Sequence, residues 1–176
     1  MTGTEIYIPT LETRRLRLRA PERRDFEPYA EFCASERARG VGGPYSRGEA
    51  FQRLAALVGH WHLRGFGRWM VTDKASGEAM GVVGVMYPDE WPEPEIAWSL
   101  FEAAEGRGIA QEAAEAARRY AYDVLGWDTI VSCTAPDNVR SIALAQRMGA
   151  ERDGSFAHPG FGELLIWRHP GREALQ

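Results

Sequence analysis

The chain has 176 residues, of which 44% are hydrophobic and 26% are charged, and its formal net charge is −4 at neutral pH. This length predicts a single domain over residues 1–176, with a core of about residues 10–170 that can bury a large apolar surface. The composition excludes a disordered chain, and the acidic balance argues against a nucleic-acid partner, which would need a basic surface.

The first elements in chain order are a strand and a short helix. Leu16 and Leu18 alternate with arginines within residues 12–20, which predicts a half-exposed strand. Residues 21–40 predict a short helix with Pro28 in its first turn, where the missing N–H costs little. The apolar face of this helix should comprise Phe26, Tyr29, Ala30, Phe32 and Cys33.

A longer helix is expected over residues 46–64. Ser46 and Glu49 have the spacing of a capping box, in which each side chain bonds the backbone N–H of the other residue. Gly65 is a typical stop signal. The inward stripe at helical spacing should comprise Phe51, Leu54, Ala55, Val58 and Trp61.

The middle of the chain predicts three strands. Residues 67–74 and 78–87 are joined by a short turn at 75–77, which indicates an antiparallel hairpin. A proline-rich loop over residues 89–95 separates this hairpin from a third strand over residues 95–101.

Next come a helix over residues 107–125 and a strand of β-branched residues within 128–135. Small residues on one face of this helix would let it lie close to a sheet. That face should comprise Ala110, Ala113, Ala114, Ala117, Ala121 and Val124.

The last predicted elements are a helix over residues 137–149, capped by Asp137 or Asn138, and a closing strand over 161–169. Residues 150–157 are a candidate for one additional strand. The inward side chains of the helix should be Ile142, Ala145 and Met148. Early strands and late βα units together predict an α+β domain. Its mixed, mostly antiparallel sheet should have about six to seven strands and helices on both faces.

The cysteines and the apolar runs limit the cellular context. Cys33 and Cys133 form neither a disulfide framework nor a metal-ligand spacing, so we expect two small buried hydrophobes and no metal. No apolar run approaches the 18 residues of a membrane span, and residues 1–16 lack the continuous apolar core of a signal peptide. We therefore expect no membrane partner and a cytoplasmic protein.

The stretch "FEAAEGRGIAQEAAEAARRYA", residues 101–121, places two glycines directly before a strong helix. A turn without side chains lets a ligand approach the backbone, and a helix start offers unpaired N–H groups with a partial positive charge. Gly106 and Gly108 thus indicate either a phosphate site or only a tight strand-to-helix turn. The P-loop string is absent and the Rossmann fingerprint lacks its third glycine, at Gln111, so the motif alone leaves both interpretations open.

Two blocks at a suitable separation carry a family resemblance. The loop pattern Gln/Arg-x-x-Gly-x-Gly/Ala falls on residues 105–110, with Glu105 at the position of the usual Gln or Arg. The pattern N-x-x-S-I-x-L-x-x-x-x-G-A falls on residues 138–150, and "WRHP" ends the pattern at 167–170. In these blocks the chain resembles the GNAT superfamily of acyl-CoA N-acetyltransferases, and within it the RimJ/RimL-like branch.

The resemblance implies acetyl transfer from acetyl-CoA to an amine and assigns a binding role to several segments. The pyrophosphate would bind the backbone amides of Gly106, Arg107, Gly108, Ile109 and Ala110. The pantetheine arm would lie along Ala97, Trp98, Ser99 and Leu100, with an oxyanion-stabilising N–H near Leu100. Asn138 would bond the pantetheine amide, or would simply cap its helix. The carboxylate of Glu105 is unwelcome there, unless it points to solvent or Arg107 compensates for it.

Two residues receive catalytic roles from the same resemblance. Glu95 matches an acidic position that serves as general base or water-holder, and the alternative is a carboxylate on the rim of the site. A tyrosine common in the family is replaced by Ala145, so Ser141 would protonate the leaving thiolate, unless it only bonds its helix backbone. Trp91, in the preceding loop, would line an acceptor pocket or pack over the sheet edge.

The implied partner is an amine acceptor, either a protein or peptide amino terminus or a small amine. A different class of function is a catalytically inactive module that binds acyl-CoA as a sensor or scaffold. The oligomeric state stays open, with a homodimer as one option.

Overall fold

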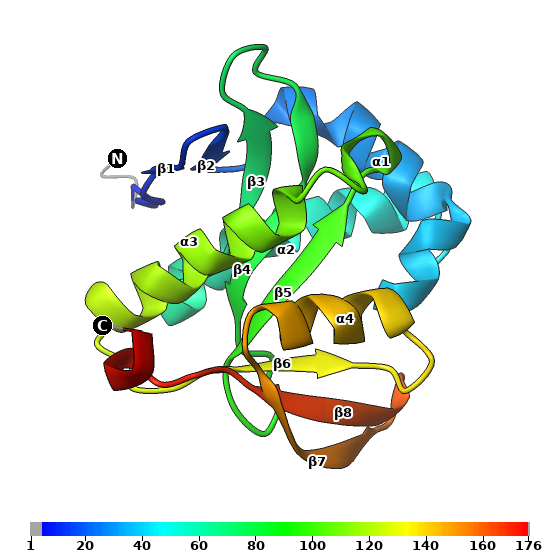
Figure 1. Ribbon diagram of the computed structural model, residues 1–176. Helices are drawn as coiled ribbons and strands as arrows, with labels where there is room; N and C mark the ends of the chain where they lie inside the picture. Colours follow the sequence, from blue (N-terminus) through cyan, green and yellow to red (C-terminus); the bar gives the residue numbers. More distant parts are fainter. Residues whose placement is uncertain (1–4, 176) are drawn as a thin grey trace.

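One mixed sheet of eight strands forms the centre of the computed structural model, which describes residues 5–175. Residues 1–4, which belong to the segment tested above for a signal peptide, lie outside the described residues. The spatial order is β1-β2-β3-β4-β5-β6-β8-β7 (Figure 1). In chain order the strands are β1 (Leu11–Glu12), β2 (Leu16–Arg19), β3 (Arg68–Asp73), β4 (Ala79–Met86), β5 (Glu95–Leu100), β6 (Val131–Thr134), β7 (Glu151–His158) and β8 (Gly162–Arg168).

All neighbouring strands run antiparallel except β5 and β6, which confirms the predicted mixed, mostly antiparallel α+β fold. The expected six to seven strands fall short of the eight observed. The additional candidate over residues 150–157 is present as β7, and the missed strand is β1. β1 has two residues, which is too short to show the alternation by which a strand is recognised in sequence.

Two helices cover each face of the sheet (Figure 1). On one face lie α3 (Ile109–Asp123) and α4 (Val139–Arg147), and on the other lie α1 (Phe26–Ala34) and α2 (Arg47–Arg64). Short 3-10 turns are η1 (Arg23–Asp25), η2 (Glu36–Val41), η3 (Glu102–Ala104) and η4 (Arg172–Leu175). Within residues 5–175, no helix is long and apolar enough to cross a bilayer.

The alanine face of α3 packs against the sheet as its spacing predicts. Its central alanines are fully buried in the main core: Ala113, Ala114, Ala117 and Ala121. The expected end of this face is wrong, because Val124 lies beyond the helix end at Asp123 and is 65% exposed. A side chain larger than a methyl along this face would push α3 away from the strands.

The first two helices depart from the expected pattern. The single helix expected over residues 21–40 is instead η1, α1 and η2, because Ser35 takes an extended conformation between the last two. Ser46 and Glu49 do form the capping box of α2. The expected inward stripe is partly wrong, since Phe51 and Ala55 are exposed. The buried residues of α2 are Ala50, Leu54, Leu57 and Trp61.

The pairing of β5 differs between its two edges. Every residue of β5 pairs with β4, whereas the pairing with β6 is limited to Glu95 opposite Val131. The two strands start together and diverge, and α4 lies across the opening (Figure 1). The β6-facing edge of β5 therefore has no strand partner from residue 97 onward.

Candidate active site

The glycine turn ends β5 and begins α3, as the sequence predicts. Gly106 and Gly108 have φ angles of 70° and 73°, in the left-handed region that favours glycine. Gly108 is the N-cap of α3 and supplies no side chain to occupy the free amides of the first turn. A Cβ added at Gly106 would meet nothing within 4 Å. The turn therefore presents bare backbone N–H groups at the positive end of a 15-residue helix.

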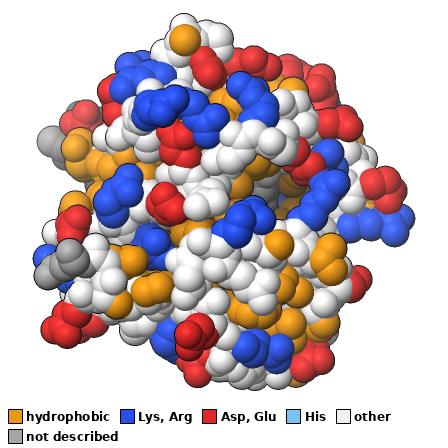
Figure 2. All heavy atoms as spheres, viewed as in Figure 1, with side chains coloured by type: hydrophobic (Ala, Val, Ile, Leu, Met, Phe, Trp, Pro, Cys, Tyr) orange, Lys and Arg blue, Asp and Glu red, His pale blue; other side chains and the backbone are white. Residues whose placement is uncertain are grey.

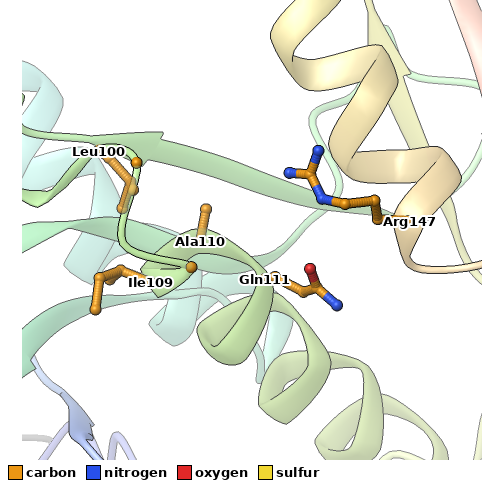
Figure 3. A pocket seen from close by; sticks show the side chains of 7 residues that line it. Leu100, Ile109, Ala110, Gln111 and Arg147 are labelled. Atoms are coloured by element: carbon orange, nitrogen blue, oxygen red, sulfur yellow. The ribbon is translucent and has the colours of Figure 1, made fainter.

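A pocket of about 310 Å³ opens over this turn. Five of the predicted cofactor-binding residues line it: Leu100, Gly106, Gly108, Ile109 and Ala110. Gln111 and Arg147 complete the lining, and their side chains extend into the pocket from α3 and α4 respectively (Figure 3). Lys and Arg side chains border the hollowed middle of this face of the molecule (Figure 2). Backbone donors and a guanidinium thus converge on one space, a combination suited to phosphate groups.

Hydrogen bonds from the amino-terminal segment hold the glycine turn and the start of α3 in place. Arg15 donates from Nη1 to the carbonyl oxygen of Arg107 at 2.9 Å and from Nε to the carboxylate of Glu112 at 2.7 Å. The hydroxyl of Thr13 donates to the same carboxylate at 2.5 Å. Because Glu112 lies in the first turn of α3, these bonds fix the turn relative to the helix start. Arg107 is held by its carbonyl, and its side chain is exposed outside the pocket lining.

Two arginines neutralise the carboxylate of Glu105. Arg37, on η2, forms an ion pair with one oxygen, and Arg140, on α4, binds the other at 2.6 Å. Neither expected explanation is correct: the side chain does not point free into solvent, and Arg107 does not compensate for it. Two arginines distant in sequence therefore offset the negative charge of Glu105 beside the glycine turn.

Four predicted cofactor-binding residues line the free edge of β5. Ala97, Trp98, Ser99 and Leu100 are half-buried and pair only with β4. Their outward backbone N–H and C=O groups have no partner strand, so an extended ligand can add to this edge as a strand does. The edge runs from the glycine turn at one end of β5 toward Glu95 at the other.

Glu95 opens β5 with a carboxyl group that is almost completely buried. Its Oε1 accepts a hydrogen bond from the indole N–H of Trp91 at 3.0 Å, and its Oε2 accepts from the backbone N–H of Cys133 at 2.7 Å. Burial raises the pKa of Glu95 to about 7, although both hydrogen bonds and the charge of Arg68 act in the opposite direction. A carboxyl group with this pKa exchanges protons near neutral pH, as a general base must.

Aromatic side chains cover Glu95. The ring of Trp91 packs at 4.8 Å from that of His158 and at 6.0 Å from that of Phe161, both from the β7–β8 hairpin. Sequence reasoning did not anticipate the bond that the indole N–H of Trp91 donates to the Glu95 carboxyl group. Cys133, expected to be a buried hydrophobe, is half-buried, and burial raises the pKa of its thiol above the usual range.

Asn138 and Ser141 occupy the start of α4. Asn138 caps the helix, with Oδ1 accepting from the backbone N–H of Ser141 at 3.2 Å. The Ser141 hydroxyl oxygen accepts from the indole N–H of Trp98 on β5 at 3.2 Å. That contact leaves the hydroxyl proton of Ser141 free to be donated elsewhere. The side-chain amide of Asn138 likewise keeps its N–H groups for another partner.

Three arginines of this region were not assigned to the site from the sequence. Arg147 was detectable in principle, because it lies nine residues after Asn138 within the second sequence block. Arg15 and Arg68 carry no motif, and only the meeting of distant segments gives them neighbours at the site.

Comparison with known proteins supports the fold and identifies the family. Residues 15–151 match a family model described as an acetyltransferase (GNAT) domain. An acetyltransferase from Agrobacterium tumefaciens str. C58 is 37% identical with a TM-score of 0.85, and the match covers 96% of this chain and 98% of that one. A protein from Bordetella pertussis assigned to the GNAT-family acetyltransferases is 27% identical with a TM-score of 0.77, over 92% and 99% of the two chains.

A ribosomal-protein-S5-alanine acetyltransferase from Vibrio fischeri shares the fold at 17% identity, with a TM-score of 0.69 over 95% of this chain and 99% of that one. Because the family model spans most of the chain and the Agrobacterium protein matches it nearly end to end, the chain belongs to the GNAT family of acetyltransferases.

Proposed function

We propose that the protein transfers the acetyl group of acetyl-CoA directly to a primary amine, with both substrates bound at once. The observation that carries this proposal is the arrangement along β5. A bare glycine turn lies at one end, an unpaired strand edge follows, and a buried carboxyl group with a pKa of about 7 lies at the other end. Phosphate, pantetheine and amine each find a suitable partner along this one strand.

The groups around the pocket would bind acetyl-CoA. The amides at residues 106–110 and the guanidinium of Arg147 would bind the pyrophosphate, since both are donors aimed at one space. Residues 97–100 would pair with the pantetheine amides, and the side-chain N–H groups of Asn138 would donate to a pantetheine carbonyl. A backbone N–H near Leu100 would stabilise the negative oxygen of the tetrahedral intermediate.

The nitrogen of an ammonium acceptor must lose two protons to become a neutral amide, and the leaving sulfur must gain one. Glu95, directly or through water, accepts a proton from the ammonium form of the acceptor. The free amine then attacks the thioester carbonyl carbon. The carbon–sulfur bond breaks as the carbonyl reforms, and the sulfur leaves as a thiolate whose ordinary pKa is near 8.5. Ser141 donates a proton to that sulfur, with its oxygen held by the indole of Trp98. The nitrogen then releases its second proton, which passes through water to the Ser141 oxygen and leaves a neutral amide.

The acceptor is a primary amine of either of two kinds. The Vibrio fischeri protein is named for an alanine of ribosomal protein S5, which agrees with a RimJ/RimL-like placement and a peptide amino terminus as acceptor. A small amine fits the same chemistry. An α-amino group, with a pKa near 7.7–8.0, needs less help from a base than a lysine-like amine near 10.4.

Binding of acetyl-CoA tests the first half of the proposal. Gly108→Glu places bulk and negative charge at the centre of the proposed phosphate site. We expect acetyl-CoA affinity, measured by isothermal titration calorimetry, to fall by about a hundredfold or more, or about 2.7 kcal/mol. Gly126→Glu is the matched control, because Gly126 has the same φ of 73° and open space around it, outside the pocket. Equal affinity in the two variants would contradict the site.

Turnover tests the second half. Free CoA, detected with a thiol reagent, should appear only when acetyl-CoA and an amine are both present. Tight acetyl-CoA binding without turnover across a broad amine panel would instead favour an inactive acyl-CoA-binding module, the class to which the alanine at position 145 points.

A further inference from the structure

A group of charged side chains lies beside Glu95 on the sheet face covered by α1 and α2. The strand register sets Arg68 opposite Gly84, Gly84 opposite Ala97, and Met86 opposite Glu95. Directly opposed residues point to the same face, and so do residues two apart in a strand. Arg68 and Glu95 therefore share one face, with Cα atoms about 12 Å apart by ordinary strand spacing. Gly84 and Ala97 add almost no bulk between them.

Arg68 has no anionic partner in the part of the chain that the structure describes. Its guanidinium donates no hydrogen bond and lies at ion-pair distance from no carboxylate among residues 5–175, although its backbone carbonyl accepts from the indole of Trp61. Burial lowers its pKa, and the groups whose charges act on it are Tyr29, Arg53 and Glu95. The side chain of Arg68 is half-buried, and none of its nitrogens is both buried and unpartnered among the described residues, so its guanidinium is open to a ligand.

A second arginine lies near Arg68. Arg53, on α2, stacks its guanidinium over the ring of Tyr45 at 4.2 Å and reaches the carbonyl oxygen of Val41 only at 3.4 Å. Its Nε is buried without any hydrogen-bond partner, and among the described residues no other buried side-chain nitrogen or oxygen shares that condition. Arg53 and Arg68 are close enough to disfavour each other's charge.

The charges of this region do not balance. The charge of Arg68 acts on both Arg53 and Glu95, and the two oxygens of the Glu95 carboxyl group are already bonded to Trp91 and Cys133. Half-buried guanidinium groups that have lost part of their water are stabilised by an anionic partner. A ligand that carries an anion would supply the missing partner, and a guanidinium fork suits the two oxygens of a carboxylate.

We propose that the acceptor is an amine that also carries an anionic group, and that Arg68, supported by Arg53, binds this group while the amine faces Glu95. The anion is a carboxylate, phosphonate or sulfonate, and the separation of Arg68 from Glu95 suits a compact molecule of amino-acid size. This inference rests on the proposed function, because it assumes transfer at Glu95. It disfavours a peptide amino terminus that has no acidic group nearby.

Matched acceptors test the proposal on the full-length protein. Each free α-amino acid is compared with its α-amide, and 2-aminoethylphosphonate and taurine are compared with ethanolamine. We expect at least one anionic acceptor to have a kcat/KM about thirtyfold or more above that of its neutral match, as for loss of one charge-assisted contact. In Arg68→Met this preference should fall to about threefold or less, and Arg68→Lys should restore part of it. Arg64→Met, an exposed arginine at the end of α2 that pairs with Asp89, is the control and should keep the full preference.

Product binding supplies a readout that does not depend on turnover. In the presence of CoA, calorimetry should show an N-acetyl amino acid binding more tightly than its N-acetyl amide, and Arg68→Met should abolish the difference. The acetyl-CoA dissociation constant should be the same in Arg68→Met and in the parent. If the parent itself does not bind acetyl-CoA, the proposed function fails. If acetyl-CoA binds but no anionic compound is used or bound better than its neutral match, the inference about Arg68 is wrong.

Discussion

Replacement of Glu95 by Gln should change the pH dependence of both stability and rate. Burial raises the pKa of Glu95 from its usual 4.5 to about 7 in the folded protein. At 1.36 kcal/mol for each pKa unit, this difference corresponds to about 3 kcal/mol of folding free energy. A glutamine side chain has nearly the same shape as the glutamate it replaces and stays neutral, so the variant should lose this pH dependence.

The direction of the effect on stability follows from the raised pKa. The folded parent holds the proton more tightly than the unfolded chain. Its stabilisation is therefore complete below pH 4.5 and is lost as the pH rises through about 7. The free energy of unfolding of Glu95→Gln minus that of the parent should thus increase by about 3 kcal/mol from pH 4.5 to pH 8. At every pH the Glu95→Gln variant is also destabilised by a constant amount of about 1–3 kcal/mol. The reason is that its new amide N–H groups face the N–H donor of Trp91 or Cys133.

The rate should report the same ionisation. The ratio of kcat/KM in the parent to that in the variant should rise through pH 7 and reach about 10²–10⁴ when Glu95 is ionised. The ionisation of the acceptor amine cancels in this ratio. The assays are thiol detection of released CoA from pH 5.5 to 9 and urea unfolding from pH 4.5 to 8. A flat rate ratio would refute the base role. A flat difference in unfolding free energy would refute the raised pKa itself.

Three further substitutions test the leaving-group acid, a buried histidine and the packing of α3. Ser141→Ala removes the hydroxyl held by Trp98 and should lower kcat about tenfold, with the acetyl-CoA dissociation constant unchanged. The loss is moderate because a thiolate of pKa near 8.5 leaves partly without help. An unchanged kcat would show that Ser141 is not the acid. Burial lowers the pKa of His169 to about 3, so its contribution to stability is present above pH 6.5 and lost as the pH falls toward 3. In urea unfolding at pH 3.5 and 7, His169→Gln should lose less stability on acidification than the parent by about 4 kcal/mol, and parallel losses would contradict this. Ala117→Leu should lower the free energy of unfolding by about 1–3 kcal/mol, whereas Ala56→Leu on the exposed side of α2 should change it by about 0.5 kcal/mol or less.

Local sequence signals predicted the elements that local physics determines. The alanine spacing of α3, the capping box of α2 and the paired glycines at 106 and 108 each act within a few residues, and the structure contains all three. The rotation of α2 was predicted wrongly because Phe51 packs edge-on against Phe26 of α1 at the surface, with a ring separation of 5.6 Å. Apolar spacing cannot distinguish such a contact between helices from one with the sheet.

The chemistry of the site depends on contacts that no local pattern contains. The position of Glu95 was evident from sequence, but its pKa depends on burial and on a donor at Cys133, which lies 38 residues along the chain. Arg68 and Arg53 come from β3 and α2, and their shared surroundings arise only when those elements pack together. Charges can be counted from the sequence, but the partner of each charge is known only from the fold.

Glu105 illustrates how such contacts reverse a local conclusion. In sequence its carboxylate opposes a phosphate ligand, whereas in the fold it binds Arg37 of η2 and Arg140 of α4 at once. Arg37 also lies 3.9 Å from a carboxylate oxygen of Glu102, so two arginines balance two carboxylates beside the glycine turn. The carboxylate of Glu105 links η2 to α4. A glutamine there would free both guanidinium groups but would also remove this link, so its effect on acetyl-CoA affinity depends on all three residues together.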